Sequence, residues 1–199
     1  MPRIGSVTGQ ERPLILGIGG TSRADSSTER ALSESLRVVQ QAGAKTRLLG
    51  GDFLSTLPIF DPGPEGPTAE QMELVAAVGE ADGVIVASPG YHGAISGVMK
   101  NAFDTLELAR AGDRPYLSDL PVGIIITAGG WQAGGTALVT LRTIVHALRG
   151  WPTPFGATLN SSVSLFDEGG RCCAEKDAAQ LATVATQVLD FARMKRRAA

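Results

Sequence analysis

Short apolar runs alternate with amphipathic stretches along most of this chain. The apolar runs predict five strands, at residues 14–19, 44–49, 83–87 and 122–126, with a weaker one within 154–160. Apolar residues at helical spacing predict helices at residues 27–42, 68–80, 95–110, 135–149 and 174–194. The alternation indicates an α/β fold, a doubly wound sandwich whose five-stranded parallel sheet has the order 2-1-3-4-5 and helices on both faces.

The length of 199 residues favours a single domain over residues 1–199. Residues 1–12 carry no periodicity and are expected to form a loose arm, while residues 194–199 are expected to form a solvated basic tail. Gly and Pro punctuate residues 50–67, which are therefore expected to form a long loop. In such a fold, ligands bind outside the carboxyl ends of the strands.

The loop after the first strand is rich in hydroxyl groups. Its donors are Thr21, Ser22, Ser26, Ser27 and Thr28, and Arg23 is its only cation. A strand, a polar turn and then a helix direct backbone N–H groups and a positive helix end at an anion, so the pattern indicates a phosphate site. The alternative interpretation is an ordinary helix cap at one of residues 25–28.

Two further loops follow strands at the same edge, and both combine glycine with one large aromatic residue. The first contains Pro89, Gly90, Tyr91, His92 and Gly93, and the second contains Thr127, Ala128, Gly129, Gly130 and Trp131. Glycine lets a flat ring approach the backbone, and an aromatic side chain offers it a rigid surface. The three loops together favour a planar ligand that bears a phosphate. The alternative is that Pro89–Gly90 and Gly129–Gly130 form turns and the aromatic side chains fill gaps.

At these residues the chain resembles a known family. Residues 20–28, residues 88–93 and the segment from Gly97 to Asp104 are similar to motifs of NAD(P)H-dependent FMN reductases, which have a flavodoxin-like fold. The resemblance spans about residues 14–155. Thr21, Thr28, Gly90 and His92 stand where the family usually carries Ser, Asn, Glu and Asn.

The resemblance implies an FMN-dependent NAD(P)H oxidoreductase. FMN would be bound by the residues of the three loops named above, and its phosphate would lie against Arg23 and the hydroxyls. A hydride would pass from NAD(P)H to flavin N5 and on to free flavin, a quinone or another small-molecule acceptor, with no catalytic acid or base from the protein. Two alternatives are a flavodoxin-like electron carrier and a non-flavin Rossmann-type dehydrogenase.

Composition narrows the possible partners. A formal net charge of −2 gives no sign of a nucleic-acid partner, and no apolar run is long enough for a membrane span. The two histidines have no partner at metal-ligand spacing, and the adjacent Cys172 and Cys173 cannot join distant segments. The polar N-terminus lacks the apolar region of a signal peptide, so a cytoplasmic location is expected.

The helices at 95–110 and 135–149 carry apolar residues over much of their circumference. These include Met99, Phe103, Leu106, Leu141 and Val145. Such helices are expected to be covered twice, by the sheet and by a second subunit, although a broad core-facing surface is the alternative. The resemblance likewise implies a homodimer or homotetramer, and it admits a monooxygenase partner supplied with reduced flavin.

Overall fold

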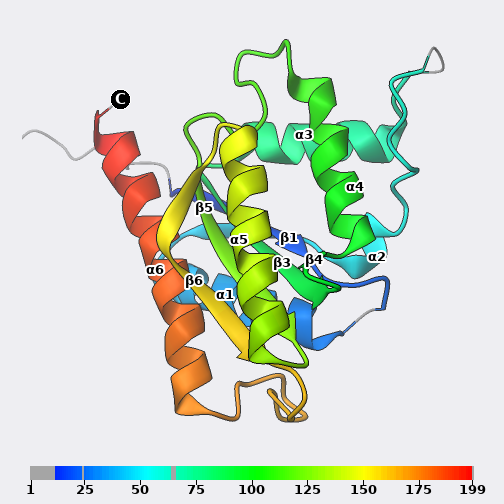
Figure 1. The fold of residues 1–199 in the computed structure, drawn as a ribbon. Coiled ribbons are helices and arrows are strands. Elements are labelled where there is room, and N and C mark those ends of the chain that lie inside the picture. Colours follow the sequence, from blue (N-terminus) through cyan, green and yellow to red (C-terminus); the bar gives the residue numbers. More distant parts are fainter. Residues whose placement is uncertain (1–11, 24, 64–65, 199) are drawn as a thin grey trace, which may run out of the picture.

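The computed structural model describes residues 12–23, 25–63 and 66–198, and its centre is one twisted sheet (Figure 1). The parallel strands are β1 (Leu14–Gly19), β2 (Lys45–Leu49), β3 (Gly83–Tyr91), β5 (Pro121–Ala128) and β6 (Trp151–Asn160). Their order, β2-β1-β3-β5-β6, is that of flavodoxin-like folds, as predicted. The predicted number of strands is wrong, because the short β4 (Ala94–Ile95) adds a sixth strand antiparallel to β3.

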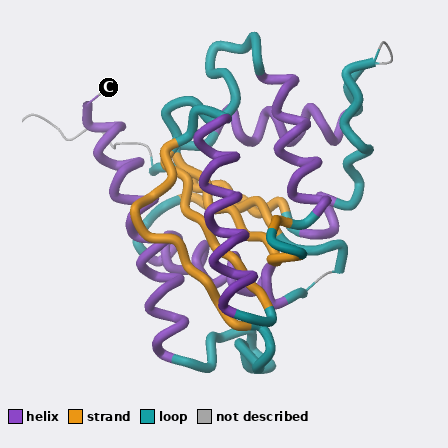
Figure 2. Tube along the Cα trace, viewed as in Figure 1, coloured by secondary structure: helices purple, strands orange, loops and turns teal. Residues whose placement is uncertain are grey.

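Helices cover both faces of this sheet (Figure 2). The helices are α1 (Ser27–Gln41), α2 (Gly51–Leu54), α3 (Ala69–Glu80), α4 (Gly97–Thr105), α5 (Trp131–Ala147) and α6 (Glu175–Ala198). One core lies under α1 and α6, and the other lies under α3, α4 and α5. The strands read as continuous apolar runs because both of their faces are buried.

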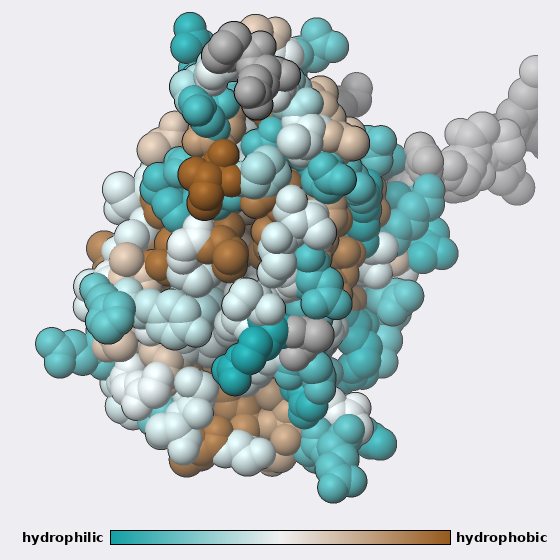
Figure 3. All heavy atoms as spheres, turned by 90° about the vertical axis from the view of Figure 1, so that its right-hand side faces the viewer, coloured by the Kyte–Doolittle hydropathy of each residue, from teal (hydrophilic) through white to brown (hydrophobic). Residues whose placement is uncertain are grey.

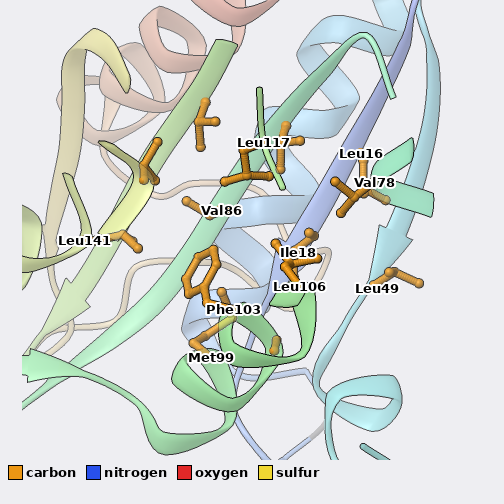
Figure 4. Close-up of a cluster of buried hydrophobic side chains, with 14 of the residues drawn as sticks. Leu16, Ile18, Leu49, Val78, Val86, Met99, Phe103, Leu106, Leu117 and Leu141 are labelled. Carbon is orange, nitrogen blue, oxygen red and sulfur yellow. The ribbon is translucent and has the colours of Figure 1, made fainter. Parts of the chain in front are cut away.

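The second core explains the apolar character of α4 and α5. Met99 and Phe103 of α4 lie against Ile18 of β1 and Val86 of β3 in one cluster, which also contains Leu141 of α5 (Figure 4). The apolar residues that led us to expect a second subunit are therefore mostly buried within one chain, and that part of the argument for an oligomer is wrong. On the face that Figure 3 shows, hydrophobic residues form separate patches among hydrophilic ones.

Several elements differ from the sequence prediction. The expected loop 50–67 contains the four-residue helix α2, whose Gly51 N–H donates to the Glu29 carboxylate at 2.7 Å. The expected helix 95–110 divides into β4, α4 and a 3₁₀ turn at Leu106–Ala109. Helix α5 begins at residue 131, four residues earlier than predicted.

The expected basic tail is not a solvated tail, because α6 continues through residue 198. Arg193 donates to the carbonyl of Ala42, and Lys195 donates to the carbonyl of Asp119 at 3.0 Å. Of the expected N-terminal arm, residues 1–11 lie outside the described part of the chain. In the described part, no helix is both long and apolar enough to cross a membrane.

Candidate functional site

Three connections meet at the carboxyl edge of the sheet. They are the β1–α1 loop (residues 20–26), the β3–β4 hairpin (residues 88–95) and the β5–α5 turn (Gly129 and Gly130). Strands β1, β3 and β5 are hydrogen-bonded neighbours, with Gly19 beside Ala87 and Ala87 beside Ile125. The topology therefore brings together the three segments that the sequence singled out.

The β1–α1 loop is shaped by its own side chains. Gly20 leaves the strand with a φ of +131°, and its N–H donates to the Ala87 carbonyl at 3.3 Å. The Thr21 hydroxyl accepts from the Arg23 N–H at 3.1 Å. Ser26 is the N-cap of α1, and its side chain accepts from the Glu29 N–H at 3.3 Å, so the capping interpretation is correct for this residue.

The hydroxyls of this loop have different environments. Thr28 is 1% exposed, and its hydroxyl is 2.6 Å from that of Thr127, which is 2% exposed. This hydrogen bond joins the start of α1 to the end of β5 across 99 residues of sequence. Ser22 and Arg23 are exposed, and the Arg23 guanidinium has no partner among the residues that the structure describes. These two side chains are therefore free to bind an external anion.

Arg30 is a structural residue of the site that the sequence analysis did not identify. Its guanidinium forms an ion pair with Asp25 (Nε to Oδ1, 2.7 Å) and donates to the carbonyl of Asp167 at 3.2 Å. Asp25 has a φ of +58°, a left-handed conformation that the ion pair helps to hold. The hydrogen bond from Arg30 also lowers the pKa of the Asp25 carboxyl. Spacing along the sequence gives no signal for the contact with Asp167, which lies 137 residues away.

The β3–β4 hairpin turns at His92 and Gly93. Both have positive φ, at 51° and 82°, and Tyr91 pairs with Ala94 across them. Positive φ at both central residues is the pattern of a two-residue type I′ hairpin. The proposed turn at Pro89–Gly90 is therefore wrong, because both residues belong to β3.

The hairpin packs closely on the start of α5. A Cβ on Gly90 would lie 3.2 Å from the Ala133 carbonyl oxygen and 3.3 Å from the Cβ atoms of Ala128 and Ala137. The Thr140 hydroxyl donates to the Gly93 carbonyl at 3.3 Å. The absence of a side chain at Gly90 thus favours the close approach of the hairpin to α5, whatever the ligand.

The β5–α5 turn leads directly into a helix without a side-chain cap. Its N-cap is Gly130, which has no side chain that could accept from the first N–H groups of α5. A Cβ on Gly129 or Gly130 would meet no atom within 4 Å among the described residues. Trp131 is the first residue of α5 and is 60% exposed, with the Lys176 ammonium 5.9 Å from its ring centroid.

Lys100 and Asn101, near the start of α4, have a structural role. The Asn101 side chain accepts from the Phe60 N–H at 2.8 Å and donates to the Pro58 carbonyl at 2.9 Å. Lys100 pairs with Asp104 one turn later at 2.7 Å. The Asn101 contacts fix the 57–60 segment on α4, and the Lys100–Asp104 pair lies within the helix itself.

The chain is similar to several known proteins. A family model described as NADPH-dependent FMN reductase matches residues 13–162. The chain is 30% identical over 182 residues to NADPH-dependent FMN reductase ArsH of Shigella flexneri. The aligned residues make up 92% of this chain and 69% of that protein. It is 34% identical over 119 residues to an FMN-dependent NADPH-azoreductase of Staphylococcus haemolyticus, over 59% of this chain and 57% of the relative.

Among solved structures, the flavoenzyme NAD(P)H:(acceptor) oxidoreductase of Paracoccus denitrificans has a TM-score of 0.72. The match covers 92% of this chain and 98% of that chain at 18% identity, so it shows a shared fold.

Proposed function

This chain belongs to the NADPH-dependent FMN reductase family, and from that premise we propose that the carboxyl edge of its sheet holds FMN. The family is one of FMN-dependent NAD(P)H oxidoreductases, so FMN and NAD(P)H are the cofactor and substrate concerned. The observation that carries the proposal is the meeting of three connections at one edge of the sheet, where the Thr28–Thr127 hydrogen bond joins the helix that follows one connection to the strand that precedes another.

The β1–α1 loop fits the phosphate of FMN. Arg23 and Ser22 are exposed at the N-terminus of the 15-residue helix α1, where backbone N–H groups and the helix dipole favour an anion. The Arg23 guanidinium has no partner among the described residues, so its five N–H donors are available to phosphate oxygens. Thr21, Ser26 and Thr28 are engaged within the protein and hold the loop in shape, while Ser27 remains a further candidate donor.

The hairpin and the β5–α5 turn fit the isoalloxazine ring. Gly129 and Gly130 have open space where a side chain would be, so a flat ring can approach their backbone. Tyr91, at the end of β3, is 51% exposed, and Trp131 is 60% exposed, so both retain apolar surface for a ring. The uncapped N–H groups at the start of α5 would stabilise negative charge on a ring edge placed there.

FMN, when bound, supplies the redox chemistry, taking a hydride from NAD(P)H and passing electrons to a second acceptor. The protein binds and orients the reactants and provides N–H donors for developing charge. The relatives support free flavin and azo compounds as acceptors to test, since one is named an FMN reductase and another an azoreductase. A quinone and a monooxygenase supplied with reduced flavin are further candidates, and a cytoplasmic location suits such an enzyme.

The proposal also includes a homo-oligomer. It rests here on exposed apolar side chains, and not on the buried apolar residues that suggested it from the sequence. Trp131, Val139 and Tyr91 are more than half exposed and lie on α5 and the hairpin that packs against it. An apolar face next to the proposed ring site would be covered by a second copy of the chain. Light scattering that finds only a 20.6 kDa species would contradict this part of the proposal.

The direct test begins with FMN. Apoprotein titrated with FMN should quench flavin fluorescence at a stoichiometry of one per chain. The loaded protein should then oxidise NADH or NADPH with free FMN, a quinone or an azo dye as acceptor, and the acceptor with the highest kcat/KM identifies the substrate class. FMN that binds without nicotinamide turnover would indicate an electron carrier, and failure to bind FMN would overturn the site.

A further inference from the structure

A cluster of positively charged side chains lies at the opposite, amino edge of the sheet. Four arginines line a cavity of about 230 Å³ there, beside the backbone of Pro13 and Gly43. Arg12 precedes β1, and Arg193, Arg196 and Arg197 belong to the last turns of α6. None of the described residues that line this cavity is acidic. In Figure 1 this end of α6, marked C, lies far from the start of α5 and hence from the proposed FMN site.

Three of the four guanidinium groups are held in place by protein oxygens. Arg12 donates to the Gly43 and Ala44 carbonyls at 2.9 and 3.0 Å, and Arg193 donates to the Ala42 carbonyl. Arg196 forms an ion pair with Asp82 at 2.7 Å. A guanidinium has five N–H donors, so each of these groups keeps donors beyond those bonds. Groups already fixed in this way lose less conformational entropy when they bind a ligand.

Contacts within the protein do not account for the whole cluster. Arg12 and Arg193 satisfy carbonyls at the C-terminus of α1, and Arg196 neutralises Asp82. Arg197 has no hydrogen-bond or ion-pair partner among the described residues.

The nearby negative groups also leave an excess of positive charge. Among the described residues they include Asp82, Asp190 in an adjoining cavity, and the carbonyl ends of α1 and α6 with about half a charge each. Together they do not balance four guanidinium groups. The excess stands out because the whole chain has a net charge of −2.

We infer that this cavity binds a phosphate-class oxyanion, such as pyrophosphate or a phosphate monoester. Guanidinium forks match the geometry of phosphate oxygens and form charge-assisted hydrogen bonds with them. The volume of about 230 Å³ exceeds that of several waters but is smaller than typical pockets for drug-sized ligands. One or two phosphate groups therefore fit. The site is separate from the proposed FMN site.

The test is a calorimetric titration of the full chain, saturated with FMN, with pyrophosphate at low ionic strength. Saturation with FMN prevents pyrophosphate from occupying the β1–α1 loop. Arg197→Gln should weaken binding at least about tenfold, as expected for loss of a charged hydrogen bond. Arg197→Lys should restore part of the affinity because it keeps the charge. The matched control Arg110→Gln removes one charge from an exposed pair with Glu107 and should change the affinity less than about twofold.

Absence of pyrophosphate binding by the wild-type chain would overturn the inference, and so would equal losses in Arg197→Gln and Arg110→Gln. A second arm identifies the source of the phosphate group. Co-sedimentation with phosphatidylglycerol vesicles, but not with phosphatidylcholine vesicles, that is lost in Arg197→Gln would assign a lipid headgroup. Pyrophosphate binding without co-sedimentation would assign a soluble phosphate compound. Thermal unfolding of each variant confirms that it is folded.

Discussion

The β1–α1 loop and the β3–β4 hairpin follow neighbouring strands, but different interactions give them their shapes. In the loop, hydroxyl and charged side chains bind the local backbone and one another, as Thr21, Ser26 and the Asp25–Arg30 pair illustrate. In the hairpin, shape comes from positive φ angles at the turn and from the close approach of Gly90 to α5. The loop therefore leaves polar groups available to an anion, and the hairpin leaves a backbone surface available to a ring.

The first prediction, with the greatest change in free energy, tests whether the β1–α1 loop binds FMN through its exposed arginine. Arg23→Ala should weaken FMN binding by about 1.5–3 kcal/mol, the range for a hydrogen bond to a charged group. The stability of the apoprotein should hardly change, because Arg23 is exposed and its guanidinium has no partner among the described residues. Fluorescence titration of the apoprotein measures the affinity, with Arg110→Ala as a control for the lost charge. An unchanged FMN affinity would remove Arg23 from the phosphate site.

The second prediction tests whether the β3–β4 hairpin depends on the close approach of Gly90 to α5. Gly90→Val should lower the free energy of unfolding by about 1–3 kcal/mol, the usual effect of overpacking. The reason is that even a Cβ at this position would lie 3.2 Å from the Ala133 carbonyl oxygen. Urea unfolding of the apoprotein measures the change, and Gly129→Val is a control at a position with open space. Equal stability of the two variants would show that the hairpin does not depend on this close approach.

The third prediction tests whether the start of α1 and the end of β5 are energetically coupled. Thr28→Val and Thr127→Val should each destabilise the apoprotein, because each leaves a buried hydroxyl without its partner. The double variant should lose less than the sum, with a coupling energy of about 1 kcal/mol. Urea unfolding of the four proteins gives this energy. Strict additivity would mean that the start of α1 and the end of β5 are energetically independent.

Features that depend on local sequence patterns were easier to predict than features that depend on contacts between distant segments. The parallel strands and long helices were predictable because buried apolar runs and helical spacing are strong local signals. Strand β3 runs beyond its predicted end because Ser88 and Pro89 pair with β5, which overrides their weak strand propensity. Helix α2 was missed because it has only four residues and its Gly51 N–H is satisfied by Glu29, 22 residues earlier in the chain.

For the candidate site, the types of residue were visible in the sequence but their individual tasks were not. Five hydroxyls and one arginine mark the β1–α1 region as polar. Which hydroxyls are engaged within the protein depends on contacts across the fold, such as that of Thr28 with Thr127. The contact of Arg30 with Asp167 and that of Lys176 with Trp131 also join distant segments, so neither leaves a periodic signal.

The smallest expected effect concerns His92, at the tip of the hairpin. Its φ of 51° is left-handed, and Gly93 follows with positive φ. Asn followed by Gly is a preferred pair for such a turn, because Asn adopts left-handed angles more readily than most residues. His92→Asn should therefore raise the free energy of unfolding by a few tenths of a kcal/mol, on the order of other favourable turn substitutions.

The control for this prediction is His92→Val, because a β-branched residue is strained at positive φ. It should destabilise the protein, because a β-branched side chain adds steric cost to the left-handed conformation that His92 already adopts. Thermal unfolding compares the two variants, and FMN titration follows the same proteins. FMN affinity should be unchanged in His92→Asn, since the hairpin is expected to act through its backbone. A weaker FMN complex with unchanged stability would instead show that the imidazole itself contacts the ring, and the hairpin would then resemble the β1–α1 loop in acting through a side chain.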